Sequence, residues 1–407
     1  MKITYVIGLL LGIVVGFSHS TLLNTAIGSG AIKINIIDIL MFILILLAIK
    51  ESRKNILEKK ILYICIMFSV ITLISLCIGL QNNYDIHLVI RDFRYITYFI
   101  LIIIIVNLLV KTADDIRTIN NIVFIISFIG IIQILFNAKN SIDSYQDILQ
   151  IKTLSIPFTA CIISASNFFA SFGKWNKLIY VPSFILILIA TILTMIRNVW
   201  LSVLLIIIMN VFYLIKHGIM KKRYVFLLLA STFIMIMFSY EIILKPKLEY
   251  TVNNYYNDTL YFRFHDALSL YDYVRGNVNI LTGAGLGADA SIYVLGGNGT
   301  LQLSDDYYTE NSYLFYYWKM GLPALILLLY LIVIRLIKLC KYRFQDIQIY
   351  NILAVYIIYI MFLAFSGGIS QVEQIFYFAY LTGINVDNVR RLEDDKSSVT
   401  DNCGDCK

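Results

Sequence analysis

Long apolar blocks, each of 16 to 23 residues, follow one another along almost the whole chain. An α-helix needs about 20 apolar residues to cross a hydrocarbon core of roughly 30 Å. Of the 407 residues, 59% are hydrophobic and only 14% are charged, whereas a soluble chain carries about 25% charged residues. This composition excludes a water-soluble enzyme, a disordered protein and a coiled coil, and it predicts an all-α polytopic membrane protein.

We expect twelve membrane spans, and polar segments separate most of them. Because the chain has only 4 prolines, most blocks can run as uninterrupted helices that satisfy their own backbone polar groups. The first block also fits a cleaved signal peptide, since Ser18 and Ser20 follow it, but we expect a retained helix. The expected spans are 4–19, 34–49, 61–80, 95–110, 119–137, 153–172, 178–195, 198–215, 224–244, 312–334, 347–366 and 371–386.

Basic residues divide unequally between the two sides that these spans define. Successive connections place 22 lysines and arginines on one side and 10 on the other, with Lys319 inside a span. The richer side is cytoplasmic by the positive-inside rule, which puts both termini inside. The net charge of +7 is therefore explained by basic loops facing an anionic membrane surface rather than by nucleic-acid binding.

The longest polar segment is predicted to lie outside as one external loop. It divides the chain into spans one to nine (1–244), the loop (245–309), spans ten to twelve (310–386) and a cytoplasmic tail (387–407). The loop is too rich in tyrosine for a solvated linker, and Asn257 or Asp258 can cap a helix that runs to about Arg275. The three glycines at residues 283–287 then predict a tight turn with exposed backbone amides. No nucleotide-binding lysine follows this turn.

The external face has few basic residues, so those it carries are candidates for binding an anion. Four of them lie at span ends or on the expected loop helix: Arg91, Arg94, Arg197 and Arg263. Guanidinium groups stay charged and bind phosphate oxygens as a fork, so several together can hold a lipid-linked diphosphate. The alternative is that each arginine snorkels or pairs with a nearby acid, Asp92 for the first two and Asp266 for the last.

A second group of candidates stands where the tenth span begins. Glu310 is either a carboxylate that stabilises a helix N-terminus or a general base that removes a proton from a sugar hydroxyl. Asn311 and Tyr313 are candidate substrate-binding residues beside it. His265 and Asp266, on the loop helix, are the alternative acid–base candidates and further substrate-binding candidates.

Other polar residues receive simpler interpretations. Lys319, about two turns into the tenth span, is expected to snorkel outward, although a charge at that depth is also a functional-site hypothesis. Asp38 is interpreted as a residue that hydrogen-bonds between helices, and Asp305 with Asp306 as a solvated turn. No group of histidine, cysteine and carboxylate residues has the spacing of metal ligands, so no metal is expected.

These residues and their layout resemble the Wzy-type O-antigen polymerases and the related O-antigen ligases. The resemblance includes an apolar helix bundle and a large external loop before the last three spans. Its motifs are Arg197 with the apolar span after it, Arg263 followed by the glycines of 283–287, and Glu310 at the start of a span with Gly321. It covers the chain from about span four to span twelve.

The resemblance implies glycosyl transfer at the outer face of the bacterial cytoplasmic (inner) membrane. A growing polysaccharide on undecaprenyl diphosphate is passed to the terminal sugar of a new lipid-linked repeat unit, which builds O-antigen or a related surface polysaccharide. By position, Arg197 and Arg263 correspond to diphosphate-binding arginines of the family, and Arg91 and Arg94 are further candidates. The implied partners are the undecaprenyl-diphosphate-linked oligosaccharide, the lipid bilayer and a chain-length regulator protein, with no metal, cofactor or nucleic acid.

One departure from the family pattern favours a polymerase over a ligase, because ligases are expected to carry a histidine where this chain has Glu310. A flippase or transporter of lipid-linked oligosaccharides is another alternative, although no repeated halves are visible and the basic residues of interest gather at one face. A metal-dependent glycosyltransferase with a polyprenyl-phosphate donor places acidic ligands in the first external loop, whereas residues 20–33 contain no Asp or Glu.

Overall fold

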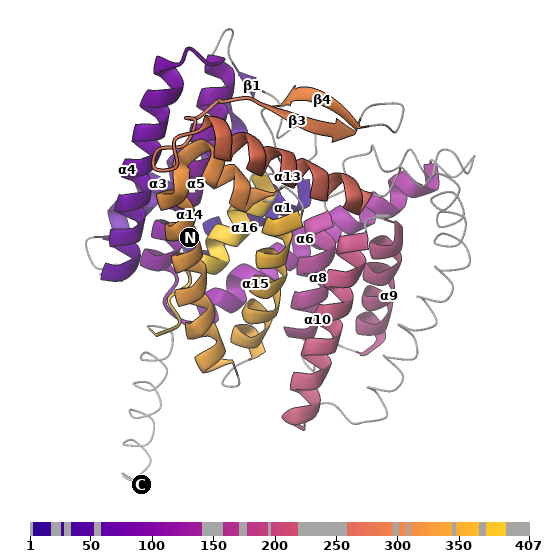
Figure 1. Cartoon of the computed structure of the whole chain (residues 1–407). Coiled ribbons are helices and arrows are strands. Elements are labelled where there is room, and N and C mark those ends of the chain that lie inside the picture. The colour runs from indigo at the N-terminus through magenta and orange to yellow at the C-terminus, as the bar shows by residue number, and fades with distance from the viewer. Residues whose placement is uncertain are drawn as a thin grey trace.

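The protein is a bundle of helices with two short antiparallel hairpins near one end (Figure 1). The structure, a computed structural model, describes the chain in segments. The described residues are 3–17, 26–27, 34–52, 58–140, 158–170, 177–193, 197–218, 259–295, 301–306, 309, 311–343, 347–365 and 372–387.

Helices occupy eleven of the twelve segments that the sequence predicts to be membrane spans. The remaining segment, residues 224–244, lies outside the described residues. The helices are α1 (Ile3–Phe17), α3 (Ile36–Ser52), α4 (Lys59–Gln81), α5 (Ile86–Leu109), α6 (Ala113–Asn140), α8 (Phe158–Ala170), α9 (Lys177–Leu193), α10 (Arg197–Lys216), α14 (Ser312–Tyr342), α15 (Ile347–Phe365) and α16 (Val372–Gly383).

Four of these helices are long and apolar enough to cross a membrane when the described residues are considered: α4, most of α10, α14 and most of α15. The chain is therefore a multi-pass helical membrane protein. Whether each of the other helices also crosses the membrane, and which side the long loop faces, stay predictions of the sequence.

The long polar loop contains a helix and a hairpin in its described part. The predicted loop helix is confirmed as α13 (Thr259–Asn277), which lies across one end of the bundle (Figure 1). Strand β3 (Ala290–Leu295) pairs with β4 (Leu301–Asp306), and earlier in the chain β1 (Ala26–Ile27) pairs with β2 (Ile34–Asn35). The two strand pairs depart from an all-α fold. The solvated turn expected at Asp305 and Asp306 is wrong, because both residues pair with β3.

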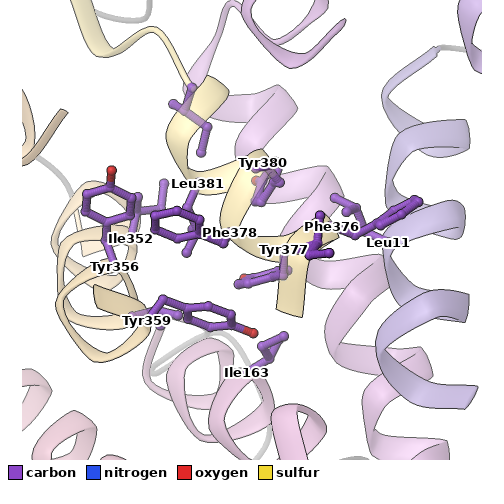
Figure 2. Packing of buried hydrophobic residues seen from close by; sticks show 14 of the residues in the cluster. Leu11, Ile163, Ile352, Tyr356, Tyr359, Phe376, Tyr377, Phe378, Tyr380 and Leu381 are labelled. Atoms are coloured by element: carbon purple, nitrogen blue, oxygen red, sulfur yellow. The ribbon is translucent and has the colours of Figure 1, made fainter. Parts of the chain in front are cut away.

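Aromatic side chains fill the core where α15 and α16 pack together (Figure 2). The rings of Tyr356 and Phe378 stack with centroids 5.4 Å apart, and Phe99 stacks with Phe378 at 6.0 Å. Tyr359 lies 6.3 Å from the same phenylalanine ring. Stacked aromatic pairs add about 0.5–1.5 kcal/mol beyond the burial of their area. This cluster therefore joins α5, α15 and α16 at the centre of the bundle.

Two side-chain contacts establish which helix ends lie together. The Tyr313 hydroxyl donates to the Ile360 carbonyl at 3.0 Å, so the start of α14 lies beside the last turns of α15. The ring centroids of Tyr213 and Tyr350 are 4.8 Å apart, so the end of α10 lies beside the start of α15. The starts of α10 and α14 therefore share one end of the bundle, which we call the loop end. The opposite end, where α14 finishes, is called the tail end.

Candidate functional site

The glycine loop, defined as residues 280–288, connects α13 to β3 and lies against α4, α5 and α14. Five consecutive backbone amides of this loop donate hydrogen bonds within the protein. Their acceptors are the Asn279 carbonyl for Gly283, the Trp318 carbonyl for Ala284, the Lys319 carbonyl for Gly285, the Ser75 carbonyl for Leu286 and the Asp92 carboxylate for Gly287, at 2.8 to 3.1 Å. The expectation of exposed amides is wrong: the loop is an anchor and offers no amide cradle to an anion.

The glycine loop also hydrogen-bonds to the backbone of α14 at the point where that helix is interrupted. Gly321 has a φ of +81°, which interrupts the helix, and the next amide, that of Leu322, donates to the Ile280 carbonyl at 2.8 Å. A Cβ atom on Gly321 would lie 2.5 Å from the Leu281 carbonyl oxygen, and one on Gly285 would lie 2.7 Å from a backbone nitrogen of α4. These positions require glycine because L side chains rarely adopt this φ and the facing atoms are backbone.

A buried ion pair stands directly beneath the glycine loop. The Lys319 side chain is 0% exposed and the Asp92 side chain 2% exposed, and their Nζ and Oδ2 atoms are 3.5 Å apart. The Lys319 ammonium also donates to the Ala288 carbonyl and lies 3.9 Å from the centroid of the Trp318 ring. The expectation that Lys319 snorkels outward is therefore wrong. A partner from α5 and a carbonyl of the loop make the inward position favourable.

Arg91 and Arg94 both follow the alternative in which an arginine pairs with a nearby acid. The Arg91 guanidinium reaches Asp92 Oδ1 through Nη2 at 3.0 Å and Nε at 3.3 Å. The Arg94 Nε atom lies 3.4 Å from Asp38 Oδ1 on α3, so its partner is a different acid from the one expected. The Arg91 side chain is still 31% exposed, so it stands at the border between the buried pair and the surroundings of the loop end.

The backbone of the remaining arginine and acid–base candidates that the structure describes lies at the loop end. Arg197 is the first residue of α10, and Arg263, His265 and Asp266 lie in the first half of α13. The His265 side chain is half-buried. The side chains of Arg197, Arg263 and Asp266, and the whole of Glu310, fall outside the described residues. The chemistry assigned to these four stays a prediction.

Two candidates beside Glu310 have structural partners at the start of α14. The Asn311 side chain accepts a hydrogen bond from the Leu314 amide at 3.0 Å, which makes it the N-cap of the helix. The Tyr313 hydroxyl donates to α15, as described above. Both residues therefore fix the opening of the tenth predicted span, and any contact with a substrate would be additional to that role.

Asp92 is the acceptor at which three segments meet, and the sequence did not predict this role. Its carboxylate receives the Gly287 amide and the Arg91 guanidinium and pairs with Lys319. A signal was present, because a lysine inside a span and an acid at the start of another span need partners in an apolar environment. Over the described part of the chain, no three His, Cys, Asp or Glu side chains gather to hold a metal ion.

The loop end thus combines three features. The glycine loop is anchored through its backbone, the Arg91 guanidinium is partly exposed, and Arg197 and Arg263 lie in the first halves of α10 and α13. Cations held near a membrane surface by a fixed scaffold can bind and neutralise a diphosphate without reorganising. The sequence matches no protein-family model and no curated protein.

Proposed function

We propose that this protein is a polysaccharide polymerase of the bacterial cytoplasmic membrane. As a glycosyltransferase, it joins undecaprenyl-diphosphate-linked oligosaccharide repeat units into O-antigen or a related surface polysaccharide. The transfer takes place at the outer face of the membrane, with the loop end facing outward as the distribution of basic residues predicts. Two membrane-tethered sugars require a catalyst that is itself embedded in the bilayer, which agrees with a multi-pass helical protein.

The observation that carries the proposal is the gathering of arginine-bearing segments at the loop end. Arg91 lies near the start of α5, Arg197 begins α10, and Arg263 lies on α13, which crosses this end of the bundle (Figure 1). These segments are far apart in the sequence. Their common location supports a shared ligand, and a diphosphate on a polyprenyl chain is the ligand whose charge and attachment to the bilayer suit it.

In the proposed transfer, a hydroxyl oxygen of the acceptor sugar bonds to the anomeric carbon of the growing chain. The bond from that carbon to the diphosphate oxygen breaks, and its electron pair stays on the diphosphate. Glu310 takes the hydroxyl proton, while Arg197 and Arg263, assisted by Arg91, neutralise the departing charge. Because the diphosphate is already a good leaving group, positioning and charge stabilisation can supply most of the acceleration.

The test is complementation of a strain that lacks this polymerase with Arg197→Ala and Arg263→Ala. Loss of one charge-stabilising group lowers kcat by about 10²–10³. We therefore expect both variants to lose long chains from the surface-polysaccharide ladder while single repeat units still reach the surface. Arg275→Ala is the matched control, because Arg275 is exposed in the last turn of the same helix, α13, and should leave the ladder unchanged.

Three other outcomes have distinct meanings. Loss of every surface unit, including single ones, indicates ligation or export instead of polymerisation. Wild-type ladders from both arginine variants at normal expression contradict the assigned site. A shortened ladder from Arg275→Ala as well shows that α13 contributes through its fold and not through Arg263.

A further inference from the structure

Lys319 is a charged residue kept fully buried in a helix that is long and apolar enough to cross a membrane. A cation at such a depth is costly, and a lysine near a span end can usually extend its ammonium to the membrane surface. Lys319 instead turns toward the Ala288 carbonyl, the Asp92 carboxylate and the face of the Trp318 ring. Every one of these partners belongs to the attachment of the glycine loop.

Each partner connects Lys319 to the loop by a different route. Ala288 is the last residue of the glycine loop, and Asp92 holds the amide of its neighbour Gly287. Trp318 packs with Leu270 and Val274, which lie in the second half of α13. Lys319 therefore reaches both the glycine loop and the helix that carries Arg263.

We propose that Lys319 is a positioning residue: with Asp92 it forms a latch that fixes the glycine loop, and through it α13, to the loop end of the bundle. Its effect on catalysis rests on the proposed function, in which α13 presents Arg263 to the diphosphate of a polyprenyl-linked sugar. Lys319 itself is fully buried and acts only through the segments that it holds.

The latch is supported by the way the loop is built. The amides of Gly283 to Leu286 bond to backbone carbonyls, so substituting a side chain removes none of their acceptors and acts on them only by freeing the loop. Gly287 alone depends on a side chain, that of Asp92, whose buried carboxylate requires a cation nearby. Removal of Lys319 leaves that carboxylate with Arg91 alone, which is partly exposed and approaches the other carboxylate oxygen.

The first measurement is hydrogen–deuterium exchange of the purified full-length protein and Lys319→Met, which keeps the apolar length of the side chain. Breaking a buried ion pair and freeing a local segment should accelerate exchange of the amides at residues 283–287 by roughly 100-fold or more. Lys338→Met is the matched control. Lys338 is a cation on the same helix that pairs with Glu58 and Asp387 at the tail end. Its loss should leave exchange in the glycine loop unchanged.

Asp92→Asn is the second variant, and it decides the question if Lys319→Met does not fold. Asparagine retains an oxygen that can accept the Gly287 amide but lacks the charge that pairs with Lys319. We expect faster exchange at the same amides, with a smaller change than for Lys319→Met. Unchanged exchange in the glycine loop of Asp92→Asn, or of a folded Lys319→Met, overturns the latch.

The second measurement separates positioning from folding. A released α13 takes Arg263 away from the diphosphate of the bound donor as well as from that of the transition state, so the KM for the undecaprenyl-diphosphate-linked donor should rise at least tenfold while kcat also falls. Merely partial unfolding lowers kcat through the active fraction and leaves KM unchanged, and that result overturns the positioning role. If the wild-type protein transfers no sugar, the proposed function fails, while the exchange data still decide whether the latch exists.

Discussion

Helix α14 carries buried cations near both of its ends, and the partners of these cations differ between the two ends. At the loop end, Lys319 has a carboxylate, a carbonyl and an aromatic face as partners. At the tail end, Lys338 bridges Glu58 and Asp387, each at 2.6 Å, and these groups are partly exposed. Arg335, one turn before Lys338, is 1% exposed, and no residue that the structure describes accepts a hydrogen bond from its guanidinium.

The difference shows what a buried charge can do in this bundle. At the loop end, the ion pair belongs to a network that includes the backbone of another segment, so its loss frees that segment. At the tail end, the pairs join the ends of α4, α14 and α16 through side chains that solvent partly reaches. Burial and partners, rather than the presence of a lysine, therefore decide how much each charge contributes.

Asp92→Leu is the sharpest test of this comparison and has the largest expected effect. It removes the acceptor of the Gly287 amide and leaves Lys319 buried without its carboxylate. Breaking a buried pair in this way costs about 3–5 kcal/mol. The measurement is thermal and denaturant unfolding of the purified protein in detergent. Glu58→Leu at the tail end should lose less, because Asp387 still pairs with Lys338; equal losses would break the comparison.

Gly321→Ala tests the backbone junction at the loop end and should have the next largest effect. The alanine must adopt a positive φ with its Cβ against the Leu281 carbonyl, which costs about 1–3 kcal/mol. Gly276→Ala is the control. Gly276 lies in α13 with nothing within 4 Å of an added Cβ, and alanine should stabilise a helix there by about 0.5–1 kcal/mol. The unfolding midpoints of the two variants should therefore move in opposite directions.

Arg335→Met should change stability little, in contrast to Lys319→Met on the same helix. Arg335 is a buried charge without a hydrogen-bond partner among the described residues, and an apolar side chain in its place removes the cost of keeping that charge out of water. The unfolding midpoint of the variant is expected to stay near that of the wild type or to rise. A loss as large as that of Lys319→Met would indicate that Arg335 has a bound partner at the tail end.

The smallest expected effect is a dependence of the protein's stability on pH, caused by the carboxyl group of Asp387 at the tail end. Burial raises the pKa of Asp387, but the hydrogen bond and charge of Lys338, with Tyr342, outweigh it and hold the pKa below its usual range. A depressed carboxyl pKa gives stability that is present above about pH 4 and is lost as the pH falls through the lower, folded-state value. Because Asp387 is 38% exposed, the contribution should stay below about 1 kcal/mol.

The check is the unfolding midpoint of the wild type and Asp387→Asn from pH 7 to pH 3. The two proteins should differ at pH 7 and converge in the acid range. A constant difference across the titration would exclude the carboxyl group as its source.

The helices were predictable because their cause is local. Apolar blocks of the right length, a cap before α13 and glycines after it can all be read along a short stretch of chain. The inward direction of Lys319 was not predictable in the same way. A lysine two turns inside a span can snorkel or pair, and the choice depends on Asp92, which lies on a distant helix.

The candidate site was predicted less completely than the fold. The glycines of the loop correctly indicated a turn, but the backbone carbonyls that accept its amides have no signature in the sequence. The pairing of Arg94 with Asp38 also joins α5 to α3, and no local sequence pattern indicates that these two helices are neighbours. The roles of Arg197, Arg263 and Glu310 remain predictions, since they depend on side chains outside the described residues.

The order of synthesis gives the junction between the glycine loop and α14 a consequence for assembly. Ser75 and Asp92 leave the ribosome before the loop does, whereas Trp318, Lys319 and the kink at Gly321 leave it afterwards. The nascent loop can therefore dock onto α4 and α5 at first with only part of its bonds. Insertion of α14 into the bilayer supplies the remaining hydrogen-bond acceptors, so the loop end of the bundle reaches its final form late in biogenesis.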